Sequence, residues 1–141
     1  MKIFDCFMYF DEDLLLDLRL NILNNFVDRF IIVESNLTHT GNLKKFQFDI
    51  NKFKNFKHKI SYFPLENLEV NKDLKLKKNW SKYHLVDQSI RNSISEYILD
   101  ASDDDWIIIS DIDELPNPNV IQIFDKRKKY SQSLRQRREV W

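Results

Sequence analysis

The chain has 141 residues, 43% of them hydrophobic and 13% aromatic, which is enough for one folded domain with a buried core. Its 22 basic and 22 acidic residues cancel, so we do not expect a nucleic-acid binder. A single glycine excludes the P-loop and the GxGxxG dinucleotide fingerprint, and a single cysteine, Cys6, excludes an intrachain disulfide and a cysteine-based zinc site. No apolar run approaches the roughly 20 residues of a transmembrane helix, so we expect no transmembrane segment.

Four strand-like runs alternate with helical or irregular stretches along the chain. We expect strands over 2–10, 28–35, 59–65 and 105–111. A helix is predicted after the first strand, over 11–26, with an apolar face formed by Leu14, Leu15, Leu18, Ile22 and Phe26. A second helix is predicted over 80–101, with an apolar face formed by Tyr83, Val86, Ile90, Ile94, Tyr97 and Ile98. The remaining stretches predict loops and one short region, 46–53, of uncertain type.

This order of elements is typical of parallel βαβ units, and it predicts an α/β fold with a mostly parallel sheet flanked by helices. We expect one α/β domain over 1–125 and a basic, poorly ordered tail over 126–141. The tail holds seven Lys or Arg residues and one Glu. A solvated, poorly ordered terminus is the favoured interpretation, and a nucleic-acid or targeting patch is the alternative.

The segment "WIIISDIDELPNP", 106–118, carries the strongest chemical signal. Trp106–Ile109 predict a buried strand, and Asp111, Asp113 and Glu114 follow it at once. Residues two apart on a strand share a face, so the two aspartates are expected to converge while Ile112 turns into the core. Like charges at such a place are unfavourable without a cation, and Mg²⁺ or Mn²⁺ is the natural partner. The alternative is a solvated strand end followed by a turn.

The motifs "FDEDLLLDLRLNIL", "VDRFIIVESNLTHTG" and "SDIDELPNP", together with the "RN" of the second predicted helix, resemble glycosyltransferase family 17 over about residues 2–124. This is the family of β-1,4-mannosyl-glycoprotein β-1,4-N-acetylglucosaminyltransferases. The resemblance implies a Rossmann-like, A-type glycosyltransferase fold whose domain over 1–125 binds a nucleotide sugar. It implies a UDP-sugar donor such as UDP-GlcNAc, and a mannosyl glycan or glycoprotein acceptor. It also implies that Asp111 and Asp113 form a DxD motif holding Mn²⁺ or Mg²⁺ against the donor's diphosphate.

Further positions match the family less specifically. The resemblance implies that Glu34 accepts hydrogen bonds from the ribose or base, although a solvated strand end is an equal alternative. Arg91 would face the diphosphate, or would instead pair with Asp87 one helical turn away. Lys44 is a further phosphate candidate. Glu12 and Arg19 are expected to form a structural pair or cap, and no catalytic residue can be assigned.

The resemblance fades after about residue 125, so a C-terminally truncated family member is expected. Without a signal peptide, a cytoplasmic location is expected, whereas eukaryotic relatives are Golgi type II membrane proteins.

Two other functions stay open. One is an inactive fragment that binds the donor or partners through exposed sheet edges. The other is a magnesium-dependent phosphatase of the haloacid-dehalogenase type, although Leu115 stands where that chemistry needs Thr or Val, and the Asp pair ends the fourth predicted strand rather than the first.

Overall fold

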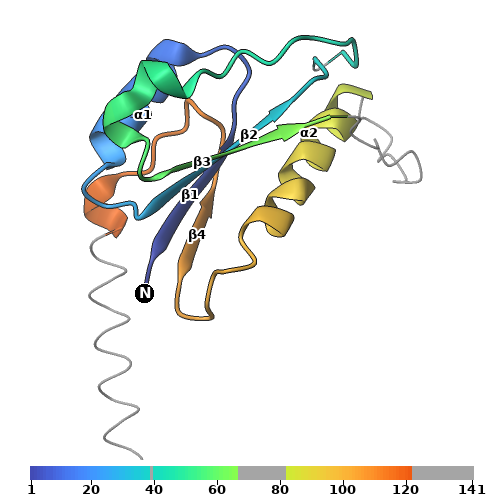
Figure 1. Ribbon diagram of the computed structural model, residues 1–141. Helices are drawn as coiled ribbons and strands as arrows, with labels where there is room; N and C mark the ends of the chain where they lie inside the picture. The colour runs from blue at the N-terminus through green and yellow to red at the C-terminus, as the bar shows by residue number, and fades with distance from the viewer. Residues whose placement is uncertain (39, 67–81, 122–141) are drawn as a thin grey trace, which may run out of the picture.

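A computed structural model describes residues 1–38, 40–66 and 82–121. Its centre is a four-stranded sheet in the order β3-β2-β1-β4, made of β1 (Ile3–Met8), β2 (Arg29–Ser35), β3 (Ile60–Leu65) and β4 (Trp106–Ile109). All three strand pairs are parallel, with Phe4 opposite both Arg29 and Ile107. The predicted α/β class with a parallel sheet is therefore confirmed (Figure 1).

Helices cover both faces of this sheet, as Figure 1 shows. One face carries α1 (Asp13–Leu23) and the 3₁₀ helix η1 (Ile50–Phe56); the other carries α2 (Lys82–Ser93), which continues as the 3₁₀ helix η2 (Ile94–Tyr97). Alternate residues of β1 and β2 face opposite layers, so each strand contributes to two cores. Phe7 and Ile32 pack on the α1 side, and Cys6 and Val33 pack on the α2 side. This double burial explains why both strands are apolar nearly throughout.

The predicted apolar face of the first helix is wrong. Leu16, Leu20 and Leu23 are buried on α1, whereas Leu14 is 82% exposed and Ile22 is 38% exposed. Leucines occur on every side of this helix, so the hydrophobic pattern fits more than one face equally well. Packing against the sheet determines which face is buried, and the buried face also contains Arg19.

The fourth strand also differs from the prediction. β4 ends at Ile109 rather than at residue 111, and Ile107 and Ile109 are 39% and 49% exposed. Among the described residues β4 pairs only with β1, so it forms an edge of the sheet, and one of its faces is not covered by a helix. The second predicted helix is confirmed in position, because Val86, Ile90 and Ile94 are buried against the sheet, but its last turn is 3₁₀. The side chain of Tyr83 and the basic tail lie outside the described residues.

Candidate functional site

The carboxyl ends of β1, β2 and β4 meet at one edge of the sheet, where the chain leaves each strand and a cavity of about 270 Å³ opens. Ligands bind at this edge in open parallel sheets because the loops that leave the strands surround it. Met8 and Val33 form part of the apolar floor. The polar wall consists of Glu12, Ser35, Lys44, Asp87, Asp111 and Asp113. The charged clusters after the first and fourth strands therefore converge on this cavity.

Asp111 and Asp113 both line this cavity, but not by the geometry that was predicted. Because β4 ends at Ile109, the two aspartates stand in a turn rather than on a strand. The turn closes through a hydrogen bond from the Glu114 amide to the Asp111 carbonyl, at 3.0 Å. Ile112 between them is 7% exposed and packs in the α1-side core. Ile112 is therefore fixed in the core, and the aspartates before and after it in the sequence both lie at the cavity.

The Asp111 carboxylate already contacts a positive charge. The Arg91 guanidinium, from the end of α2, donates to Oδ1 of Asp111, a residue that lines the cavity. Both side chains are partly exposed, 38% and 45% respectively, so this ion pair is accessible to solvent and to a ligand. From the sequence, Arg91 was expected to face a diphosphate or to pair with Asp87, and its contact with Asp111 was not predicted.

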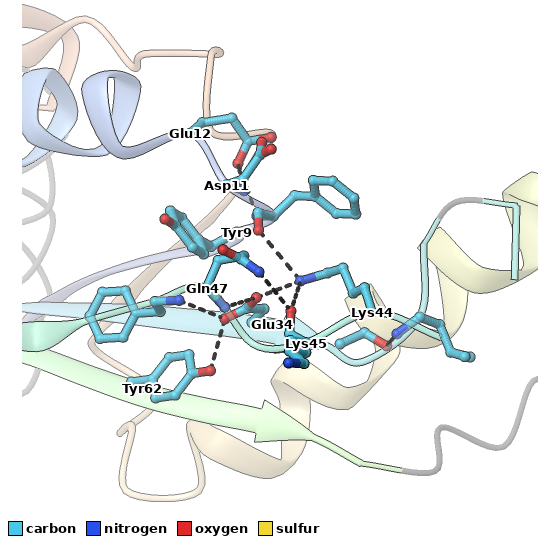
Figure 2. Close-up of polar contacts among 12 residues, drawn as sticks. Tyr9, Asp11, Glu12, Glu34, Lys44, Lys45, Gln47 and Tyr62 are labelled. Atoms are coloured by element: carbon cyan, nitrogen blue, oxygen red, sulfur yellow. Dashed lines mark hydrogen bonds and ion pairs between the residues drawn. The ribbon is translucent and has the colours of Figure 1, made fainter. Parts of the chain in front are cut away.

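Glu34 lies at the end of β2 and is fully buried, beside the cavity rather than in its wall. Figure 2 shows its carboxylate between donors from the segment 44–48 and from β3. Gln47 N donates to one oxygen at 2.8 Å, and Phe48 N and Tyr62 Oη donate to the other at 3.1 and 2.8 Å. Burial, followed by the hydrogen bond to Glu34, raises the pKa of Tyr62, so this hydroxyl stays a donor over the ordinary pH range. Glu34 therefore fastens the segment after residue 43 to the sheet.

Lys44 connects Glu34 to the cavity. Its ammonium group donates to Glu34 Oε1 at 2.5 Å, lies over the Phe10 ring at 4.7 Å from the centroid, and has a side chain only 11% exposed (Figure 2). The same residue lines the cavity. The structure thus places a fixed, nearly buried cation in a wall where four of the five charged side chains from the described part of the chain are acidic.

The sequence did not foresee a buried ion pair beneath this site. Arg19 of α1 and Asp5 of β1 are both fully buried, and the guanidinium binds both carboxylate oxygens, at 2.7 and 2.8 Å. Arg19 was expected in a structural pair or cap with Glu12. Instead, Glu12 accepts hydrogen bonds from the amides of Phe10 and Asp11. A signal was present, since Asp5 is the only charge in "IFDCFM" and Arg19 is the one base in the helix. A lone acid in an apolar strand, followed by a helix with a single base, indicates a buried pair.

The donor set suits a hard divalent cation. Magnesium and manganese commonly bind one or two carboxylates and complete their coordination with water and substrate phosphates. Asp111 and Asp113 supply two carboxylates on one cavity, and the guanidinium on Asp111 demonstrates that this position accepts positive charge. Within 1–38, 40–66 and 82–121, no group of three or more His, Cys, Asp or Glu side chains is arranged to hold a metal by itself. A cation bound here would therefore depend on the ligand for part of its coordination.

The fold and the acidic strand-end cavity are those of an α/β protein that binds its ligand at the carboxyl edge of a parallel sheet. The model of glycosyltransferase family 17 matches residues 1–138, and the chain belongs to that family. This match extends past residue 125, where we had expected the resemblance to fade. No curated protein and no solved structure matches the chain. In the part of the chain that the structure describes, no helix is long and apolar enough to cross a bilayer.

Proposed function

We propose that this glycosyltransferase uses a nucleotide-sugar donor, UDP-GlcNAc, together with Mn²⁺ or Mg²⁺ held by Asp111 and Asp113, and that it transfers N-acetylglucosamine to a mannosyl glycan. The observation that carries the proposal is the presence of both aspartates on one cavity at the carboxyl edge of the sheet. The family assignment supports the class of reaction. The donor, the metal and the acceptor are the proposed parts.

The charge of the cavity supports a cation as partner of the donor. A diphosphate is anionic, and the wall formed by Glu12, Asp87, Asp111 and Asp113 would repel it, since Lys44 is the single base among the described residues of that wall. A divalent ion on the two aspartates would reverse the local charge and make the site attractive to the diphosphate. When bound, such an ion stabilises the negative charge that develops on the departing diphosphate as the sugar–phosphate bond breaks.

The chain's own bases have complementary roles in this proposal. Arg91 contacts Asp111, which lines the cavity, and presents a planar, bidentate donor suited to a phosphate. Lys44 is held in the wall by Glu34 and contributes a second positive charge. Glu34 orients Lys44 and the segment 44–48; the direct contact with ribose or base, implied by the resemblance, stays a prediction.

Thermal unfolding with UDP-GlcNAc and Mn²⁺ tests the donor site. At a ligand concentration 100 times Kd, binding stabilises the folded state by about 2.7 kcal/mol, which raises Tm by roughly 5–11 °C for a chain of this size. Asp113→Ala should abolish the rise. Asp103→Ala is the matched control, because Asp103 belongs to another Asp-x-Asp pair in an exposed turn at the opposite end of β4 and should keep the full rise.

Transfer of radiolabelled N-acetylglucosamine to a mannosyl acceptor then separates the enzyme from an inactive fragment. A donor-dependent rise in Tm with no transfer would favour the fragment that only binds the donor. Release of phosphate from small phosphoesters would favour the phosphatase interpretation. If no UDP-sugar changes Tm in the presence of Mn²⁺ or Mg²⁺, the proposed donor site is wrong.

A further inference from the structure

Arg19 sits at the centre of a hydrogen-bond cluster that joins α1, β1 and the turn carrying the acidic pair. The side chain is fully buried, and its guanidinium lies over the Phe7 ring with 4.6 Å between the guanidinium carbon and the ring centroid. Nε and Nη2 donate to the two oxygens of Asp5. This bidentate contact fixes the plane of the guanidinium, and it leaves one edge of the group directed at the turn after β4.

The remaining donors of Arg19 all bind that turn. Nη2 donates to Ser110 Oγ at 2.7 Å. Nη1 faces the backbone carbonyl oxygens of Asp111, Ile112 and Glu114 at 2.8, 3.2 and 3.1 Å. Only a guanidinium can serve both sides of this arrangement, since it carries five donors in a rigid fork while a lysine carries three on a flexible stem.

A buried ion pair of this kind is by itself weak evidence of a role in stability. Replacing such a pair with well-packed apolar residues is often neutral or stabilising, because both charges lose their hydration when they are buried. The specific feature here is that three backbone carbonyls of one turn converge on a single nitrogen, Nη1. The turn also carries Asp111, Asp113 and Glu114, whose mutual repulsion favours an open conformation. The positive charge of Arg19 beneath the turn opposes that opening.

We infer that Arg19, oriented by Asp5, is a positioning residue that fixes the backbone of residues 110–114 so that Asp111 and Asp113 present their carboxylates to the cavity. What those carboxylates hold rests on the function proposed above. The positioning itself does not, because it follows from contacts within the chain. Residues that orient metal ligands in this way typically contribute 10- to 100-fold to metal affinity.

The test compares wild type with Arg19→Lys, which keeps the charge and removes the fork. Amide order parameters from ¹⁵N relaxation measure the turn directly: we expect values near 0.85 for residues 111–114 in wild type and below about 0.6 in the variant, with β2 unchanged. Titration with Mn²⁺ alone should show affinity reduced by about 10- to 100-fold. Arg29→Lys is the matched control, since Arg29 also binds an aspartate with both oxygens, Asp100, but on the surface. It should leave both measurements at their wild-type values.

A folded Arg19→Lys protein with a rigid turn and wild-type Mn²⁺ affinity would overturn the inference while leaving the proposed function intact. Absence of Mn²⁺ binding in wild type, both alone and in the presence of UDP-GlcNAc, with a loosened turn in the variant, would overturn the proposed function and support the positioning. If Arg19→Lys does not fold, Ser110→Ala decides the matter, because it removes one contact between the guanidinium and the turn. A turn as rigid as that of wild type in Ser110→Ala would then overturn the inference.

Discussion

Glu34→Gln should strongly destabilise the protein, although it changes a single atom of the side chain. The carboxylate is fully buried and receives four donors, from Lys44, Gln47, Phe48 and Tyr62. Two donors face each oxygen. If Oε1 becomes the amide NH₂, Lys44 Nζ and Gln47 N both meet another donor; if Oε2 does, Phe48 N meets one, whereas the Tyr62 hydroxyl can rotate to accept. In either case Lys44 loses its anionic partner. An unsatisfied buried donor costs about 1–3 kcal/mol, and breaking a buried ion pair by changing one partner costs about 3–5 kcal/mol.

We therefore expect the free energy of unfolding to fall by about 3–5 kcal/mol, which lowers Tm by roughly 6–20 °C. Urea unfolding followed by circular dichroism measures the change. Tyr62→Phe removes one of the four donors and keeps the charge, so a smaller loss of about 1–3 kcal/mol is expected. Glu96→Gln, at an exposed position of η2, is the matched control and should stay within about 0.5 kcal/mol of wild type. A loss below 1 kcal/mol in Glu34→Gln would refute the reasoning.

Three further predictions concern the core and the ionisable groups. Leu20→Ala should cost about 2–5 kcal/mol of unfolding free energy because Leu20 is fully buried, whereas Leu14→Ala, at a position 82% exposed, should cost less than about 0.5 kcal/mol; equal losses in urea melts would contradict the observed helix face. Burial, and then the nearby Asp5 charge, raise the pKa of Cys6 from 9.0 to about 12, so its contribution to stability is complete below pH 9 and is lost as pH rises toward 12, by up to about 1.4 kcal/mol per pH unit. Cys6→Ala should show a shallower decline over that range, and an unchanged slope would argue against the buried thiol as its source. Hydrogen bonds from the backbone of Ser102 and Lys2 lower the pKa of Asp105 from 3.8 to about 2, so the stability it adds is present above pH 4 and is lost as pH falls toward 2. Acid unfolding of Asp105→Asn should therefore depend less on pH between 4 and 2 than that of wild type, and coincident curves would count against this role.

Hydrophobic patterning was sufficient to predict the fold class. Strands buried on both faces carry continuous apolar runs, and β1 and β2 have them because helices cover both sides of the sheet. The order of strands and helices then predicted parallel pairing, since a crossover helix returns the chain in the same direction. The face of α1 could not be predicted this way, because leucines surround the helix and only packing against the sheet distinguishes Leu20 from Leu14.

The acidic site likewise has residues that the sequence predicts and partners that only the tertiary structure reveals. Asp111 and Asp113 could be found from local sequence, because carboxylates directly after an apolar strand are unusual enough to indicate a ligand. Their partners could not be found, since Arg91 and Arg19 lie 20 and 92 residues from Asp111 along the chain. Spacing and periodicity describe neighbours along one element. Which distant charges meet in the interior depends on how the layers pack, and that packing joins Arg19 to Asp5 and to the turn beneath the cavity.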